Sequence, residues 1–138
     1  MPDAYQHLLV KEYKHWSVYL HENQGYLGRC ILWCKREDAK KLTNATQEEQ
    51  QELFSILKCV EKTLQECFGP DLLNFAFLGN EVPHLHCHII PRYESERIFM
   101  QVRFNDSRFG KNYQTDRGLH YSVNLLHNVK NFLQEHIL

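Results

Sequence analysis

The alternation of apolar and polar positions predicts several strands around one main helix. In residues 15–21, Trp16, Val18 and Leu20 alternate with polar or amphipathic side chains, which is typical of a strand with one buried face. The turn-forming residues 22–25 that follow predict a hairpin with the next strand. Strands are expected at residues 15–21, 26–35, 72–79, 84–91 and 97–104.

The clearest element is a helix that begins after Thr46. Thr46 and Glu49 have the spacing of a capping box, in which each side chain binds the backbone N–H of the other residue. Apolar residues then recur at steps of three and four, which gives the helix one apolar stripe. Gly69 and Pro70 end the helix. The stripe consists of Leu53, Phe54, Leu57, Val60, Leu64 and Phe68.

The remaining residues complete a single α+β domain. Residues 105–118 read as an irregular surface loop, and a second helix is expected from about Ser122. No repeat, low-complexity tract or linker divides the chain, so residues 1–138 are expected to form one domain. We therefore expect about five antiparallel strands with a main helix and a C-terminal helix. The helical spacing of the second helix is carried by Leu125, Val129, Phe132 and Leu133.

Composition and charge narrow the function. The chain has 138 residues, 43% of them hydrophobic and 24% charged, as in ordinary globular proteins. A formal net charge of −1 argues against nucleic-acid binding through a general basic field, although a small anionic ligand needs only a local group of donors. No apolar run approaches the roughly 18 residues that span a bilayer, and the N-terminus resembles neither a secretory signal nor a transit peptide. We expect no membrane contact and a cytoplasmic location.

The five cysteines are expected to be reduced, buried thiols. They are odd in number and contain no C-x-x-C pair, which argues against a disulfide framework. Cys30 and Cys34 have a C-x-x-x-C spacing, which by itself is a weak indication of half a zinc site.

The most informative stretch is EVPHLHCHIIPRY, residues 81–93, which places a histidine at every second position. On a strand, successive side chains point to opposite faces, so His84, His86 and His88 share one face. The apolar residues between them share the other face and are suited to the core. The histidine face is therefore expected to be a cleft or the solvent side of the sheet.

Three interpretations of this face follow from the residues themselves. The first interpretation is a metal site. Neighbouring histidines lie roughly 6.6 Å apart on a strand and the outer two roughly 13 Å, whereas zinc ligands lie within about 3.5 Å of one another. One ion therefore cannot bind all three histidines unless the strand bends. Unrelated surface histidines on an edge strand are a second interpretation. In the third, one imidazole attacks phosphorus, another acts as the acid for the departing group, and the last orients the set.

Residues 84–90, HLHCHII, resemble the His-φ-His-φ-His-φ-φ signature of the histidine triad superfamily of nucleotide hydrolases and transferases, where φ is apolar. Residues 79–83, GNEVP, are similar to the Gly-Gln-x-Val-x that precedes the signature in this family. The run 78–93 looks especially like the bacterial branch of diadenosine polyphosphate hydrolase-like proteins. The resemblance covers roughly residues 15–93, and residues 94–138 correspond to a part that varies within the superfamily.

The resemblance implies a role for each histidine. His86 takes the position that attacks the α-phosphorus of a nucleotide and forms a covalent nucleotidyl-histidine. His88 would assist the leaving group, and a histidine at this position favours hydrolysis over transfer. His84 would hydrogen-bond within the strand and orient the set. The family fold, a five-stranded antiparallel sheet with two helices, usually pairs as a symmetric homodimer. No metal or other cofactor is implied.

The resemblance also implies contacts with the substrate. Asn74 lies near a phosphate-contacting Asn of many members, and Leu20 and His21 fall where the family contacts base and ribose. Gly28-Arg29 replaces a Gly-His pair whose histidine supports the triad, so that Arg29 would either point into solvent or approach a phosphate. The expected substrate contacts are Leu20, His21, Arg29, Asn74, Gly79 and Asn80.

The sequence thus predicts a hydrolase that cleaves a nucleoside 5′-phosphoryl bond in a diadenosine polyphosphate or a nucleotide conjugate. Whether the bond is P–O, P–N or P–S stays open. The cations that the sequence places near an anionic substrate are Arg29 and Arg92. One alternative is a nucleotide-binding or adaptor protein with negligible turnover, and another is a zinc-binding domain.

Overall fold

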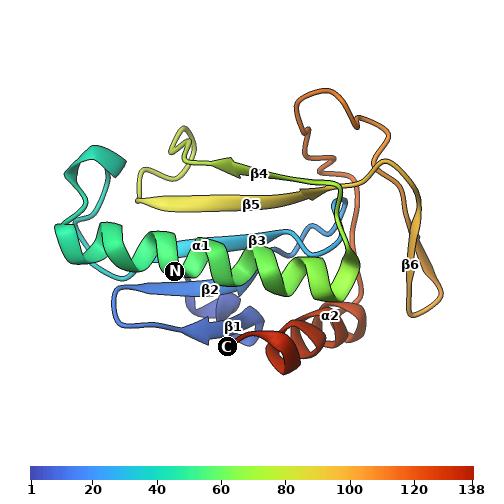
Figure 1. Ribbon diagram of the computed structural model, residues 1–138, viewed down its shortest axis with the longest axis horizontal. Helices are drawn as coiled ribbons and strands as arrows, with labels where there is room; N and C mark the ends of the chain where they lie inside the picture. Colours follow the sequence, from blue (N-terminus) through green and yellow to red (C-terminus); the bar gives the residue numbers. More distant parts are fainter.

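Two helices cover one face of a five-stranded antiparallel sheet in the computed structural model, which describes residues 1–138 (Figure 1). The strand order is β1-β2-β3-β5-β4, which confirms the expected α+β fold with a main and a C-terminal helix. Neither helix has the length and apolar character needed to cross a membrane. The strands are β1 (Leu9–Glu12), β2 (Trp16–Leu20), β3 (Cys30–Cys34), β4 (Leu72–Ala76) and β5 (His86–Arg92), and the helices are α1 (Gln47–Phe68) and α2 (Val123–His136), with short 3₁₀ helices η1 (Asp3–Leu8) and η2 (Leu42–Asn44).

Helix α1 has the expected caps and a slightly different buried stripe. The Thr46 hydroxyl accepts a hydrogen bond from the Glu49 backbone N–H (3.1 Å), and the Glu49 carboxylate accepts one from the Thr46 N–H (2.8 Å). Gly69 ends the helix in the left-handed conformation. The prediction was wrong at Phe54, whose side chain is 65% exposed, because Ile56 completes the stripe instead and is fully buried.

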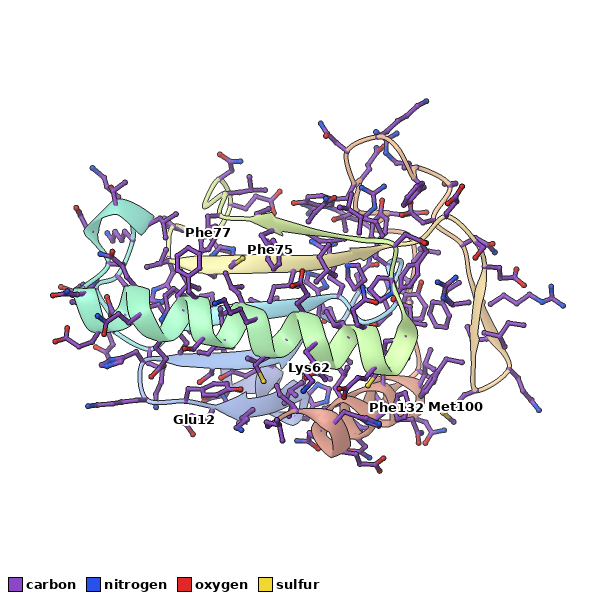
Figure 2. All side chains as sticks on the ribbon, in the orientation of Figure 1. Glu12, Lys62, Phe75, Phe77, Met100 and Phe132 are labelled. Atoms are coloured by element: carbon purple, nitrogen blue, oxygen red, sulfur yellow. The ribbon has the colours of Figure 1, made fainter.

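The expected strand at 97–104 is not part of the main sheet. These residues form a separate hairpin of β6 (Arg97–Phe99) and β7 (Val102–Phe104), and the fifth strand of the main sheet is β1. The turn residues Met100 and Gln101 have φ angles of 51° and 66°, a conformation that sequences usually mark with Gly or Asn. Figure 2 shows Met100 near Phe132 of α2, and the Phe99 and Phe132 rings lie 5.7 Å apart.

Strand β3 begins later than the expected range 26–35. The residues before Cys30 form a loop in which the Arg29 N–H donates to the Tyr26 carbonyl (3.0 Å). Gly28 in this loop has a φ of 88°, which only glycine adopts without strain. The loop therefore sets the position from which the Arg29 side chain leaves the chain.

The histidine strand lies inside the sheet, between β3 and β4, and is not an edge strand. It begins at His86, so that the expected range 84–91 is two residues too long at its start. Cys87 and Ile89 are fully buried in the core beneath the helices, while His86 and His88 belong to the opposite, open face. The separation into a core face and a histidine face is as the alternation predicted.

The loop 105–118 is anchored to the sheet by a buried ion pair. Arg92 and Asp106 are joined by hydrogen bonds of 2.7 and 3.2 Å, and their side chains are 3% and 1% exposed. All five N–H donors of Arg92 are used within the protein, so its expected place beside a phosphate is corrected to a structural one. The other acceptors are the Asn74 side-chain oxygen and the backbone carbonyls of Arg108 and Lys111.

All five cysteines are free, but only three of them are buried as expected. Burial raises the pKa of Cys30 and of Cys87 to about 12 and the pKa of Cys34 to about 11, so these groups remain thiols at neutral pH. Cys59 and Cys67 are partly exposed.

Candidate active site

Four histidines and a tryptophan gather on the open face of the sheet. The rings of His86 and His88 lie 5.1 Å apart, and His21, directly after β2, lies 5.7 Å from His88. His84, just before β5, stacks on Trp33 at 4.1 Å with an interplanar angle of 12°. Trp33 pairs with His86 across β3 and β5, which places both side chains on the same face.

Hydrogen bonding fixes which nitrogen of His86 can act as a nucleophile. The His86 Nδ1 atom lies 2.6 Å from the backbone carbonyl oxygen of His84. A carbonyl only accepts, so Nδ1 carries the hydrogen and donates it. In the neutral ring the lone pair is therefore on Nε2.

His84 orients His86 through its backbone, whereas its own ring is held elsewhere. The His84 Nε2 atom donates to the Cys34 carbonyl at 2.7 Å, and the ring is stacked on Trp33. These two contacts fasten the segment before β5 to the end of β3. The carbonyl that faces His86 is positioned as a result.

Arg29 lies beside the third histidine and does not point into solvent. Its side chain is buried, and its Nη2 atom is 3.2 Å from Nδ1 of His88. Its Nη1 atom donates to the Thr115 hydroxyl at 2.8 Å, and the guanidinium lies over the Tyr113 ring at 5.4 Å. The C-terminal segment thus contributes two residues to the surroundings of the triad.

Burial and a neighbouring cation keep two of the rings neutral. Burial lowers the pKa of His88, the charges of Arg29 and His86 act in the same direction, and together they bring it to about 4. Burial lowers the pKa of His21 to about 3, again with help from Arg29 and His88. His21 Nδ1 accepts from the Asn23 N–H at 2.9 Å, so the hydrogen of this neutral ring is on Nε2.

The other expected contacts occupy different places. The Leu20 side chain is fully buried on the helix-covered face, which corrects its expected side-chain contact with a base. Asn74 is on β4, where its oxygen accepts from Arg92 at 2.9 Å. Gly79, with a φ of 72°, and the exposed Asn80 lie in the loop between β4 and β5.

Sequence reasoning missed Trp33, Tyr113 and Thr115. Trp33 could have been assigned to the open face, because it follows the buried Leu32 in a strand. No pattern in the sequence indicates that Tyr113 and Thr115 contact Arg29. Beside Trp33, the open face is hollowed by a cavity of about 240 Å³ that also touches Tyr19 and Lys35.

The histidines do not form a metal-ligand set. No three His, Cys, Asp or Glu side chains of the chain come together as ligands for one ion. The zinc alternative thus has no ligand set here.

Sequence comparisons find similarity to two curated relatives that are named as phosphatases of dinucleotides. The bis(5′-adenosyl)-triphosphatase of Saccharomyces cerevisiae is 30% identical over 76 residues, which are 51% of this chain and 37% of the relative. The asymmetrical bis(5′-nucleosyl)-tetraphosphatase of Schizosaccharomyces pombe is 24% identical over 95 residues, 62% of this chain and 52% of the relative. The chain spans between about a third and about half of the length of these curated relatives.

Solved structures agree with the fold over nearly the whole chain. A histidine triad protein from Bradyrhizobium japonicum has a TM-score of 0.74 and 23% identity, covering 100% of this chain and 97% of that one. A histidine triad protein from Sinorhizobium meliloti has a TM-score of 0.77 and 17% identity, covering 99% and 96%. The family model described as HIT domain matches residues 4–95, which include β1 to β5 and the triad. The chain therefore belongs to the HIT domain family.

Proposed function

We propose that this protein is a nucleotide hydrolase that cleaves a nucleoside 5′-phosphoryl bond through a covalent nucleotidyl intermediate on His86. The observation that carries the proposal is the hydrogen bond from His86 Nδ1 to the His84 carbonyl at 2.6 Å. It leaves the Nε2 lone pair as the reactive end of the ring, on the open face of the sheet.

Dinucleoside polyphosphates are the substrate class that the relatives support. The two curated relatives are named for cleaving bis(5′-adenosyl) triphosphate and bis(5′-nucleosyl) tetraphosphate. The site of this chain offers a donor for such an anion, because neutral His21 carries a hydrogen on Nε2. Asn74, Gly79 and Asn80 remain proposed contacts of the phosphates.

In the first step, the His86 Nε2 lone pair attacks the α-phosphorus. A P–N bond forms, the bond from phosphorus to the bridging oxygen breaks, and its electron pair leaves on the departing phosphate. His86 then carries a positive charge, which strengthens its hydrogen bond to the His84 carbonyl. In this proposal His88, whose ring lies 5.1 Å from that of His86, donates a hydrogen bond to the leaving oxygen.

In the second step, water attacks the same phosphorus. The P–N bond breaks, its electron pair returns to Nε2 of His86, and the water gives one proton to the solvent. The products are a nucleoside 5′-monophosphate and the neutral imidazole, ready for another cycle.

Incubation with diadenosine triphosphate and diadenosine tetraphosphate, followed by chromatography, tests the proposal. Wild-type protein should release a mononucleotide, and His86→Ala should lower kcat by more than about 10³-fold, because the covalent nucleophile is lost. His136→Ala is the matched control, since His136 is on α2, on the opposite face of the sheet, and should leave turnover unchanged.

Two results would contradict this mechanism or this function. Wild-type turnover by His86→Ala would refute the covalent step. Tight binding of AMP by calorimetry, without turnover of any nucleotide in a panel, would favour the alternative of a nucleotide-binding or adaptor protein.

We also propose that the protein pairs as a homodimer through β4. This strand is at the edge of the sheet and has unpaired backbone groups on one side. Leu72, Phe75 and Leu78 are 53%, 41% and 57% exposed along this edge, and Figure 2 shows Phe75 and Phe77 above α1. Light scattering after gel filtration should give twice the chain mass, and Phe75→Glu should give a monomer.

A further inference from the structure

The contact between Arg29 and His88 restricts where His88 can carry a hydrogen. A guanidinium has five N–H donors and no acceptor, and Arg29 Nη2 lies 3.2 Å from His88 Nδ1. Nδ1 must therefore accept, and the hydrogen of the neutral ring is on Nε2. A second proton on Nδ1 would bring two N–H groups and two positive charges face to face.

Arg29 is held firmly in this position. Its side chain is only 3% exposed, its Nη1 atom donates to the Thr115 hydroxyl at 2.8 Å, and Tyr113 lies 5.4 Å from the guanidinium carbon. Its Nε atom is buried without a hydrogen-bond partner. The guanidinium is therefore held by its contacts with Thr115, Tyr113 and His88 and not by a complete set of hydrogen bonds. The segment that supplies Thr115 and Tyr113 is itself anchored by Asp106.

We propose that Arg29 is a positioning residue that holds His88 as a neutral Nε2–H donor and thereby restricts the enzyme to phosphoanhydride substrates over phosphoramidates. This inference rests on the proposed hydrolase function and names the class of bond that the hydrolase accepts. Arg29 takes this role through His88 and does not itself contact the reacting atoms.

The chemistry of the leaving group explains the restriction. When the α-phosphorus of an anhydride is attacked, the bridging oxygen leaves on a phosphate that is stable as an anion, so a hydrogen bond from Nε2 is sufficient. When a phosphoramidate is attacked, the nitrogen must receive a proton as the P–N bond breaks, or an amide anion would leave. Neutral His88 has a single ring proton, and its loss would produce an imidazolate, which is too basic to form at neutral pH.

The surroundings of His88 contain no group that would favour a second proton. The charged and titratable groups that face it are Arg29 just before β3, His21 just after β2 and His86 on β5. Strand β4 places Ala76 opposite it, and no carboxylate is part of this set. The pKa of His88, lowered to about 4 by burial and by the charges of Arg29 and His86, agrees with this geometry.

The test compares two substrates with the same adenylyl group, diadenosine triphosphate and the phosphoramidate of AMP with a primary amine. Arg29→Gln removes the charge and presents a carbonyl that can accept from His88 Nδ1. It should lower the ratio of kcat/KM values, anhydride over phosphoramidate, by at least about tenfold, because an added general acid contributes about 10²–10⁴-fold to the phosphoramidate reaction. Without the Arg29 charge, the pKa of His88 should rise above about 4 but stay below its ordinary value, because burial persists. The phosphoramidate rate should therefore begin to rise at a higher pH in the variant than in the wild type as the pH falls.

Two further variants separate positioning from a structural role. Arg29→Lys keeps a positive charge and donors only, so it should retain the wild-type ratio. Arg103→Gln makes the same chemical change at an exposed residue of β7, where the side chain is 73% exposed, and should leave both rates unchanged. An unchanged ratio and pH dependence in Arg29→Gln would overturn the inference.

A measurement on the wild type protects the test against a variant that fails to fold. The ¹⁵N chemical shifts of the histidine rings should show His88 as the Nε2–H tautomer at neutral pH, and an Nδ1–H or doubly protonated ring would overturn the inference. If wild-type protein cleaves neither substrate, the proposed function itself fails, whereas cleavage of both with equal efficiency contradicts only the role of Arg29.

Discussion

Replacement of Asp106 by asparagine removes one charge from the buried ion pair that anchors the C-terminal segment, with almost no change in side-chain shape. The Asp106 carboxylate accepts two hydrogen bonds from Arg92, at 2.7 and 3.2 Å. It also accepts from the backbone N–H groups of Tyr93 (3.2 Å) and Arg108 (3.1 Å). In Asp106→Asn the guanidinium remains buried without a counter-charge.

The burial of this ion pair sets the expected loss in the free energy of unfolding. Removal of one partner from a buried ion pair usually costs about 3–5 kcal/mol, because the remaining charge is left uncompensated. The asparagine oxygen can keep one bond to Arg92, so we expect the lower end, about 3 kcal/mol. With an m-value of about 2 kcal/mol per M, the urea midpoint should fall by about 1.5 M.

Urea unfolding followed by circular dichroism checks this value. Asp116→Asn is the matched control in the same loop, because its exposed side chain accepts only from the Gly118 N–H at 3.0 Å, and it should change stability by less than about 0.5 kcal/mol. A midpoint for Asp106→Asn within about 0.3 M of wild type, at equal m-value, would refute the structural role of the ion pair.

Two further substitutions test the local structure. Gly28→Ala would place a Cβ 2.9 Å from Leu64 Cδ2 at a φ of +88°, and should destabilise the fold by about 2–4 kcal/mol in urea unfolding; an unchanged midpoint would show that the loop can adjust. A hydrogen bond from Arg36 lowers the pKa of Glu49 to about 2. The ionised carboxylate therefore stabilises the fold at pH values above its ordinary pKa of 4.5, and this contribution is lost as the pH falls toward 2. Glu49→Gln should therefore lower stability at pH 7 and flatten its decline in acid, and a parallel acid decline in both proteins would contradict this linkage.

Local signals in the sequence were sufficient for the elements that depend on local chemistry. The capping box of Thr46 and Glu49 set the start of α1, and strand alternation separated Cys87 and Ile89 from the histidines. Alternation also placed Leu20 in the core, where the structure finds its side chain, although the family resemblance suggested a substrate contact.

Features that depend on distant parts of the chain could not be predicted. Arg29 and Thr115 are 86 residues apart in sequence, and only the anchored C-terminal segment brings them together. The hairpin turn at Met100 and Gln101 lacks the glycine or asparagine that would have revealed it, so that 97–104 read as one strand. Strand β1 has only four residues, too few for a clear alternation.

The stereochemical course at phosphorus shows whether His86 forms a covalent intermediate. Each in-line displacement inverts the configuration, so two successive displacements restore it. The substrate is a diadenosine polyphosphate with a chiral phosphorothioate at the α-position, hydrolysed in water enriched in heavy oxygen. A covalent intermediate on His86 should give AMP phosphorothioate with retained configuration. Inversion would mean that water attacks directly and would contradict a nucleophilic role of His86.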